Sequence, residues 1–266
     1  MLGGAFSSLF RDRYELYPAD LGEVDIRQPD LIIDDICRHE PDLVMHLAAM
    51  TDVDLCEEEP DEAYSVNALG TRNVALACQR SGAVMVYINT GSIYDGSKDT
   101  PYTEYDPPGP LNVYGRSKYA GELYVRELLS RFYIFYTCWM FGGGAEDKKF
   151  VAKIIDLARQ NRELSVVDDK RGSPTYTVDM ASAMFHFVET GLFGRYHCAN
   201  KGSVNRFEVA SAVLEAAGIE DCTLRRVPSS EFDLPATRPR NESLRNYNFE
   251  LLGLEMMRDW RSALEE

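Results

Sequence analysis

A phenol and an ammonium spaced four residues apart are the side chains of this sequence best suited to chemistry. Tyr114 and Lys118 lie in a run, residues 113–131, whose pattern predicts a helix. Residues four apart share one face of a helix, so both groups would reach one site. The ammonium would favour phenolate and lower the pKa of Tyr114 from about 10 toward neutral pH. Such a phenol can give a proton to a carbonyl oxygen that is becoming an alcohol.

Hydroxyl groups follow an apolar segment, residues 84–88, that we predict to be a parallel strand. Ligands of parallel sheets bind outside the carboxyl ends of the strands, which is where Thr90 and Ser92 would lie. A hydroxyl there could bond to the carbonyl oxygen that Tyr114 protonates. An ordinary turn explains the same residues, because Ser, Thr, Asn and Gly are turn formers.

Small and polar residues mark the ends of other predicted elements. Ala48 and Ala49 follow the predicted strand 43–47 and would let a flat ligand approach the backbone, although close helix–strand packing explains them equally well. Asn67 interrupts a run of good helix formers and could bond to backbone across the sheet or cap a kink. Trp139 could pack on a sugar, but most tryptophans are core residues.

An acidic residue closes the segment 14–17, which we also predict to be a strand. That residue is Asp20. A carboxylate at this place often binds the 2′-hydroxyl of a ribose, which favours NAD over NADP.

Apolar runs alternate with amphipathic segments, which predicts an α/β fold with a doubly wound parallel sheet and a small C-terminal α/β lobe. We place a dinucleotide-binding region at residues 1–141. Residues 142–266 would supply the remaining sheet elements and the substrate-binding lobe, interleaved with the first part. The predicted strands are 14–17, 43–47, 84–88, 132–138 and 164–167, and the predicted helices are 31–39, 62–80, 113–131, 150–161, 178–190 and 206–217. The segment 225–245 is predicted to be irregular.

Composition excludes several classes of protein. The 28 basic and 43 acidic residues give a net charge of −15, so nucleic acid and anionic membrane are poor partners. No segment approaches the roughly 20 apolar residues that cross a bilayer, and no signal peptide is visible. The six cysteines are scattered, which is typical of reduced residues in a cytoplasmic protein. The four histidines show no spacing typical of a metal site.

The motifs together resemble the dTDP-4-dehydrorhamnose reductase family of the extended short-chain dehydrogenase/reductase superfamily. The resemblance covers nearly the whole chain in the expected order. It rests on His46–Asp54, Glu59-Pro60, Asn67-Ala68, Asn89–Gly96, Pro110–Lys118, Ala120–Glu122, Trp139 and Arg238–Leu244.

That resemblance implies an oxidoreductase of dTDP-rhamnose biosynthesis. NADH or NADPH would deliver hydride to C4 of a nucleotide-linked 4-keto-6-deoxy sugar. A homodimer is compatible with the resemblance. The implied catalytic set is Thr90, Tyr114 and Lys118. The implied cofactor contacts are Gly3, Asp20, Asp25, Ile26, Ala48, Ala49, Met50, Asn67, Tyr114 and Lys118. The implied sugar contacts are Thr51, Asp52, Val53, Ser92 and Trp139. We predict no metal site within the chain, and a metal that bridges subunits stays an open question.

The chain departs from the family pattern at three places. The family opens with a strand and a Gly-x-x-Gly-x-x-Gly turn, whereas this sequence starts at Met1-Leu2-Gly3-Gly4, which resembles the last third of that motif. The Rossmann-like sheet would then lack its first strand, and we expect weaker dinucleotide binding than in a form that carries the motif. Gly91-Ser92 replaces the usual Asp-Tyr, and Tyr136 replaces a common Arg.

Two other functions are compatible with the same motifs. The same family resembles the regulatory β subunit of methionine adenosyltransferase, which keeps a Tyr-x-x-x-Lys, so a non-catalytic regulatory subunit is one alternative. An epimerase or dehydratase of nucleotide sugars is the other alternative. Those enzymes regenerate their nicotinamide and would not consume it.

Overall fold

The centre of the chain is a four-stranded sheet, seen in a computed structural model that describes residues 1–144, 147 and 149–266. The strand order is β1-β2-β3-β8, and all three pairings are parallel. The strands are β1 (Leu43–His46), β2 (Val84–Thr90), β3 (Phe132–Thr137) and β8 (Gly194–His197). Their carboxyl ends therefore meet at one edge. This arrangement confirms the predicted Rossmann-like α/β fold.

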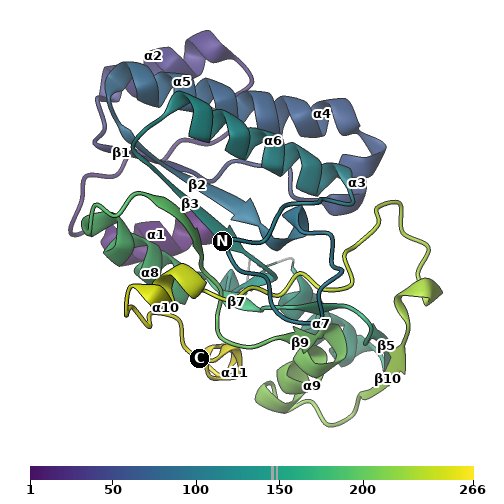
Figure 1. Cartoon of the computed structure of the whole chain (residues 1–266). Helices are drawn as coiled ribbons and strands as arrows, with labels where there is room; N and C mark the ends of the chain where they lie inside the picture. Colours follow the sequence, from purple (N-terminus) through teal and green to yellow (C-terminus); the bar gives the residue numbers. More distant parts are fainter. Residues whose placement is uncertain (145–146, 148) are drawn as a thin grey trace.

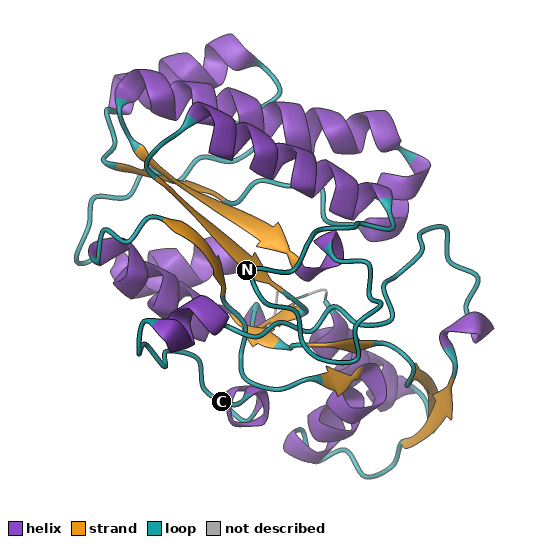
Figure 2. Ribbon diagram, viewed as in Figure 1, coloured by secondary structure: helices purple, strands orange, loops and turns teal. Residues whose placement is uncertain are grey.

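Helices cover both faces of the sheet (Figures 1 and 2). One face carries α2 (Pro29–His39), α5 (Thr71–Ser81) and α6 (Val113–Leu128), and the other carries α1 (Leu2–Phe10), α8 (Thr177–Glu189) and α10 (Tyr247–Leu251). Successive strand residues point to opposite faces. Tyr87 of β2 accordingly joins the core under α2, α5 and α6, whereas its neighbour Val86 joins the core under α1 and α8.

A smaller α/β lobe lies beside this sheet, at the lower right of Figure 1. Its elements are α7 (Phe150–Gln160), β5 (Glu163–Val167), α9 (Arg206–Ala216), β10 (Thr223–Val227) and α11 (Trp260–Leu264). β5 and β10 pair in parallel, and Ile154, Val166, Val213 and Trp260 form part of a separate apolar core. The division at residues 141 and 142 stays a prediction, since β8 and α8 of the second range belong to the sheet body.

Short elements connect these parts. The helices are α3 (Val53–Glu58), α4 (Pro60–Tyr64), a π-helix η1 (Ser65–Gly70) and the 3₁₀ turns η2 (Gly91–Ile93) and η4 (Ser229–Glu231). Two-residue strands pair as β4 (Met140–Phe141) with β7 (Thr175–Tyr176) and as β6 (Arg171–Gly172) with β9 (Val204–Asn205). The helix predicted over 62–80 is thus three elements, with the π-helix in the middle.

Two sequence-based predictions of secondary structure were wrong. Residues 14–17 form no strand, because they pair with no other segment among the described residues. Aromatic contacts hold this segment instead: the Tyr14 ring lies 4.4 Å from that of Phe185, and its hydroxyl donates to Glu189. The first residues of 225–245 are not irregular, since β10 extends to Val227.

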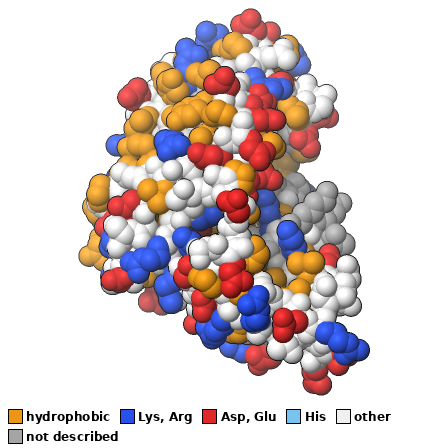
Figure 3. Space-filling view, turned by 90° about the vertical axis from the view of Figure 1, so that its right-hand side faces the viewer, with side chains coloured by type: hydrophobic (Ala, Val, Ile, Leu, Met, Phe, Trp, Pro, Cys, Tyr) orange, Lys and Arg blue, Asp and Glu red, His pale blue; other side chains and the backbone are white. Residues whose placement is uncertain are grey.

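The surface mixes both signs of charge. On the face shown in Figure 3, acidic and basic side chains are interspersed. Within the part of the chain that the structure describes, no helix combines the length and the apolar character needed to cross a membrane.

Candidate functional site

Helix α6 carries Tyr114 and Lys118 at the carboxyl edge of the sheet. Its start is fixed by Asn112, whose side-chain oxygen accepts a hydrogen bond from the backbone N–H of Gly115 at 2.8 Å. Asn112 also donates to the carbonyl of Thr237 at 2.8 Å, which connects the helix to the segment 225–245. An Asn at this position satisfies one of the free N–H groups of the first turn. Tyr114 is therefore held in the first turn of a firmly capped helix.

Two glycines let α6 approach the rest of the site. A methyl group added at Gly115 would lie 2.3 Å from the carbonyl oxygen of Ser92, and one added at Gly121 would lie 2.4 Å from that of Asn67. Real side chains do not tolerate such distances. The close contacts bring α6 directly against η2 and η1, which carry Ser92 and Asn67.

Thr90 lies beside Tyr114 and is oriented by its own neighbours. Its backbone N–H donates to the Asn89 side chain at 2.9 Å, and its hydroxyl accepts from the Ser92 N–H at 3.2 Å. Asn89 in turn donates to Glu122 at 2.6 Å, a fully buried carboxylate on α6. The end of β2 is thereby bonded to the helix that carries Tyr114.

The phenol of Tyr114 is protonated at neutral pH. Burial raises the pKa of Tyr114 well above 10, and the neighbouring Thr90 side chain opposes this shift without cancelling it. The predicted lowering of this pKa by Lys118 is therefore wrong in the structure, because burial disfavours the charged phenolate. The effect of Thr90 on this pKa indicates that the phenol and the Thr90 side chain are close together.

Lys118 is buried, with 4% of its surface exposed. Its ammonium lies 4.2 Å from the centre of the Tyr87 ring, and the Tyr87 hydroxyl donates to the Lys118 carbonyl at 2.9 Å. Burial lowers the pKa of Lys118 to about 7. Among the described residues no carboxylate forms an ion pair with this ammonium, so its donors face the site uncommitted.

Asn67 connects the end of β1 to α6. Its side-chain oxygen accepts from the Met50 N–H at 2.9 Å, and its amide donates to the Met50 carbonyl and to the Ser117 hydroxyl, both at 3.0 Å. The π-helix places this fully buried amide, and π-helical turns are common at functional sites. Of the two predicted roles for Asn67, the structure supports the bond to backbone. The strand end at Ala48 and Ala49 is exposed and half-buried, respectively.

The residues predicted to contact the outer part of a dinucleotide are less uniform. Gly3 lies on α1, where an added methyl group would meet Leu47 at 3.5 Å. Asp25 is bound by Arg27, which holds the pKa of that carboxyl at about 2, and Ile26 packs against Gly70.

Asp20 does not close a strand. It lies exposed in a loop, where its carboxylate accepts from the Leu21 N–H at 2.7 Å. The argument that Asp20 favours NAD over NADP required a strand at 14–17, so it loses its structural basis.

The predicted sugar contacts lie around the same edge. Thr51 is exposed and accepts from the Lys149 ammonium at 3.2 Å. Asp52 caps α3 by accepting from the N–H groups of Asp54 and Leu55, both at 3.1 Å, and Val53 is the first residue of that helix. The Asp52 carboxylate therefore has a structural role in this conformation.

Trp139 stands in a strained backbone conformation with φ +47°. A left-handed conformation is costly for a bulky residue and is typical of positions held by their function. Its indole N–H donates to Glu242 at 2.5 Å, and Ser92 donates to the same carboxylate at 2.8 Å. Two of the predicted sugar contacts thus converge on one further residue.

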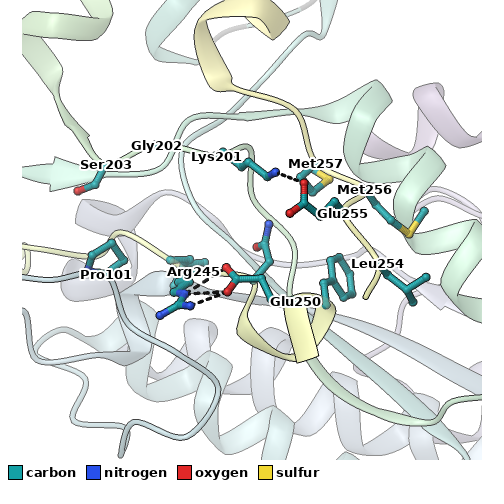
Figure 4. A pocket seen from close by; sticks show the side chains of 13 residues that line it. Pro101, Lys201, Gly202, Ser203, Arg245, Glu250, Leu254, Glu255, Met256 and Met257 are labelled. Atoms are coloured by element: carbon teal, nitrogen blue, oxygen red, sulfur yellow. Dashed lines mark hydrogen bonds and ion pairs between the residues drawn. The ribbon is translucent and has the colours of Figure 1, made fainter. Parts of the chain in front are cut away.

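A pocket elsewhere on the molecule does not belong to this site. Figure 4 shows it lined by 13 residues, none of which is a predicted site residue. Its charged side chains are paired, Lys201 with Glu255 and Arg245 with Glu250. We assign it no part in the chemistry.

Comparison with known proteins agrees with this geometry. The family model described as RmlD substrate binding domain matches residues 1–266. The chain belongs to that family. It is 40% identical over 234 residues to the dTDP-4-dehydrorhamnose reductase of Mycobacterium tuberculosis strain CDC 1551, covering 86% of this chain and 76% of that protein.

Solved structures extend the likeness of this RmlD-family chain to three dimensions. The dTDP-4-dehydrorhamnose reductase of Bacillus anthracis, solved in complex with NADP, superposes with a TM-score of 0.95 at 36% identity, covering 99% of this chain and 93% of that one. The Clostridium acetobutylicum reductase gives a TM-score of 0.95 at 34% identity with the same coverage. The resemblance inferred from the sequence is confirmed, and the relatives are named as oxidoreductases.

Sequence reasoning missed two residues of this RmlD-family site. Glu242 lies within Arg238–Leu244, which supported the resemblance but received no role. Arg206 stacks on Trp139, with its guanidinium carbon 3.6 Å from the ring centre. The sequence around Arg206 gives only a helix-start signal, the Asn205 and Glu208 capping box.

Proposed function

We propose that this chain is an NAD(P)H-dependent reductase of a nucleotide-linked 4-keto-6-deoxy sugar, with dTDP-4-dehydrorhamnose as its substrate. The observation that carries the proposal is the convergence of Thr90, Tyr114 and Lys118 at the carboxyl edge of the parallel sheet. A hydroxyl, a protonated phenol and an uncommitted ammonium are the groups that carbonyl reduction needs. The names of the 30–40% identical relatives support the choice of sugar.

The residues present fit a nicotinamide dinucleotide. Lys118 offers ammonium donors to ribose hydroxyls, and the strand end at Ala48 and Ala49 is exposed and half-buried, respectively. Helix α1 begins at Leu2, with Gly3 next to the end of β1, and a helix start favours negative phosphate groups. Asn67 would keep the Met50 backbone in place against the ring system. We leave the choice between NADH and NADPH open and would test NADPH first, because the Bacillus anthracis relative was solved with NADP.

In the proposed reaction, a bound dinucleotide supplies the hydride that reduces C4 of the sugar. Thr90 holds the C4 oxygen through its hydroxyl. Tyr114 gives its phenolic proton to the same oxygen, so the product is an alcohol. The raised pKa of Tyr114 keeps that proton in place until negative charge develops on the substrate oxygen. Lys118 then stabilises the phenolate that Tyr114 leaves.

A Tyr114→Phe variant tests the proposed function. The ring keeps its packing but has no proton to give, so kcat for dTDP-4-dehydrorhamnose should fall by the ~10²–10⁴-fold typical of general acid catalysis. The measurement is NADPH oxidation followed at its absorbance maximum, with the dTDP-rhamnose product quantified in the same samples. Unchanged NADPH affinity and thermal stability would show that the loss is chemical. A variant that turns over at the wild-type rate would remove Tyr114 from the mechanism.

A further inference from the structure

Glu242 is a half-buried carboxylate at the centre of the candidate site. It lies in the segment 225–245, 150 residues from Ser92 in the chain. The Ser92 hydroxyl donates to Oε2 of Glu242 at 2.8 Å. Trp139 donates to its Oε1 at 2.5 Å. The backbone of Glu242 also lies against η2, since a methyl group added at Gly91 would be 2.6 Å from the Glu242 carbonyl oxygen. The carboxylate is therefore fixed in position rather than mobile.

Ser92 joins this carboxylate to the catalytic residues. Its N–H donates to the hydroxyl of Thr90, and its carbonyl lies against Gly115, the residue after Tyr114. The negative charge of Glu242 is close enough to contribute to the raised pKa of Tyr114. Glu242 thus lies next to the place where Thr90 and Tyr114 would hold a ketone oxygen.

Trp139 is supported from behind. The guanidinium of Arg206 stacks on the Trp139 ring at 3.6 Å and on the Phe150 ring at 4.6 Å. Burial lowers the pKa of Arg206 to about 10, and the charge of Glu242 partly opposes that shift. Arg206 therefore stays charged at neutral pH, and Trp139 cannot move away from Glu242 without losing this contact.

The carboxylate keeps unused hydrogen-bonding capacity. An ionised carboxylate has about four acceptor positions. Each oxygen of Glu242 receives one neutral donor, and among the described residues no cation forms an ion pair with it. Glu242 is half-buried, so a ligand in the site can reach it. A charged acceptor with free positions, placed beside a catalytic hydroxyl, is suited to a donor on the substrate.

We propose that Glu242 is a specificity-determining residue that accepts a hydrogen bond from the C3 hydroxyl of the sugar. This inference rests on the proposed function. In a 4-keto-6-deoxy sugar, the two carbons beside C4 differ, because C3 carries a hydroxyl and C5 carries a methyl group. A carboxylate attracts the hydroxyl and is poorly matched to the methyl group. Glu242 would therefore decide which way round the ring lies over Tyr114.

Ligand binding separates this role from a structural one. We would titrate wild type and Glu242→Gln with dTDP-rhamnose and with dTDP, which lacks the sugar, at saturating NADP⁺. Loss of one charge-assisted hydrogen bond should lower the affinity of Glu242→Gln for dTDP-rhamnose roughly 10- to 100-fold. The affinity for dTDP should stay the same, and so should that for NADP⁺. Glu220→Gln, at an exposed carboxylate in the lobe, is the matched control and should bind all three ligands as wild type does.

A substrate lacking the C3 hydroxyl gives an independent measurement. Wild type should prefer dTDP-4-dehydrorhamnose to its 3-deoxy analogue by a similar factor in kcat/KM, and Glu242→Gln should lose that preference. If Glu242→Gln does not fold, Ser92→Ala takes its place, because it removes one of the two donors that fix the carboxylate. This variant should bind dTDP-rhamnose more weakly than wild type and dTDP equally well.

Each outcome decides the matter. Two results would overturn the role of Glu242 while leaving the reductase function intact. One is that Glu242→Gln loses affinity for dTDP and for dTDP-rhamnose equally, and the other is that this variant still discriminates against the 3-deoxy analogue. A wild-type chain that binds dTDP but neither binds dTDP-rhamnose nor reduces the keto sugar would overturn the proposed function itself, and the role of Glu242 with it.

Discussion

Lys118 combines charge with burial at the centre of the site. Its pKa is lowered to about 7 because the ammonium loses hydration, so the charged form is present below that pH and disappears above it. The protonated form is the one that can hold ribose hydroxyls and stabilise the phenolate of Tyr114. Activity should therefore depend on pH in a range where Tyr114 itself stays protonated.

We expect kcat/KM for the keto sugar to fall as pH rises through about 7, because this parameter follows ionisation of the free enzyme. Stability should change in the opposite direction. The unfolded lysine titrates near 10.4, so between about 7 and that value the unfolded chain binds more protons and stability rises with pH. Paired measurement of kcat/KM and urea unfolding from pH 6 to 9 separates the two effects. A flat rate profile, or loss of activity that follows unfolding, would contradict this role of Lys118.

At the scale of elements, the fit of α6 against η1 and β2 decides where the catalytic groups lie. Gly121 faces the carbonyl of Asn67, and a methyl group there would also lie 2.8 Å from the Tyr87 hydroxyl. Those two neighbours respectively position Met50 and contact Lys118. Packing at this glycine therefore affects the cofactor side and the proton-donor side together.

Gly121→Ala should push α6 away from η1 and reduce both stability and activity, although alanine is the better helix former. Overpacking of this kind typically costs about 1–3 kcal/mol, whereas helix propensity would return only about 1. Chemical unfolding and NADPH-dependent turnover are the measurements. Gly22→Ala is the control, because nothing lies within 4 Å of a methyl group there. A Gly121→Ala chain as stable and active as the control would show that this contact yields easily.

At the scale of the whole molecule, local sequence signals predicted what local structure determines. The three strands β1, β2 and β3 are apolar runs followed by small or polar residues, and Tyr114 and Lys118 owe their common face to helix periodicity alone. Thr90 was found because it lies just beyond the predicted strand 84–88, and in the structure it is the last residue of β2. Each of these signals lies within a few neighbouring residues, so it can be recognised from the sequence without knowledge of the fold.

Features that depend on distant contacts were missed. Strand β8 contains Arg195 and His197 and is recognisable as a strand only once it pairs with β3. The reverse error occurred at residues 14–17, where an apolar and aromatic segment lacks a partner. Glu242 meets Ser92 and Trp139 through tertiary contacts across more than 100 residues. The pKa of Tyr114 was predicted in the wrong direction because burial was unknown.

The central claim is that this chain reduces a nucleotide-linked keto sugar with hydride from a nicotinamide dinucleotide. The most direct test is transfer of deuterium from C4-deuterated NADPH to the product of dTDP-4-dehydrorhamnose. We predict one deuterium at C4 of the sugar and one NADPH oxidised for each product formed. Product that carries no deuterium, or that forms without net loss of NADPH, would contradict the account and favour an epimerase or dehydratase.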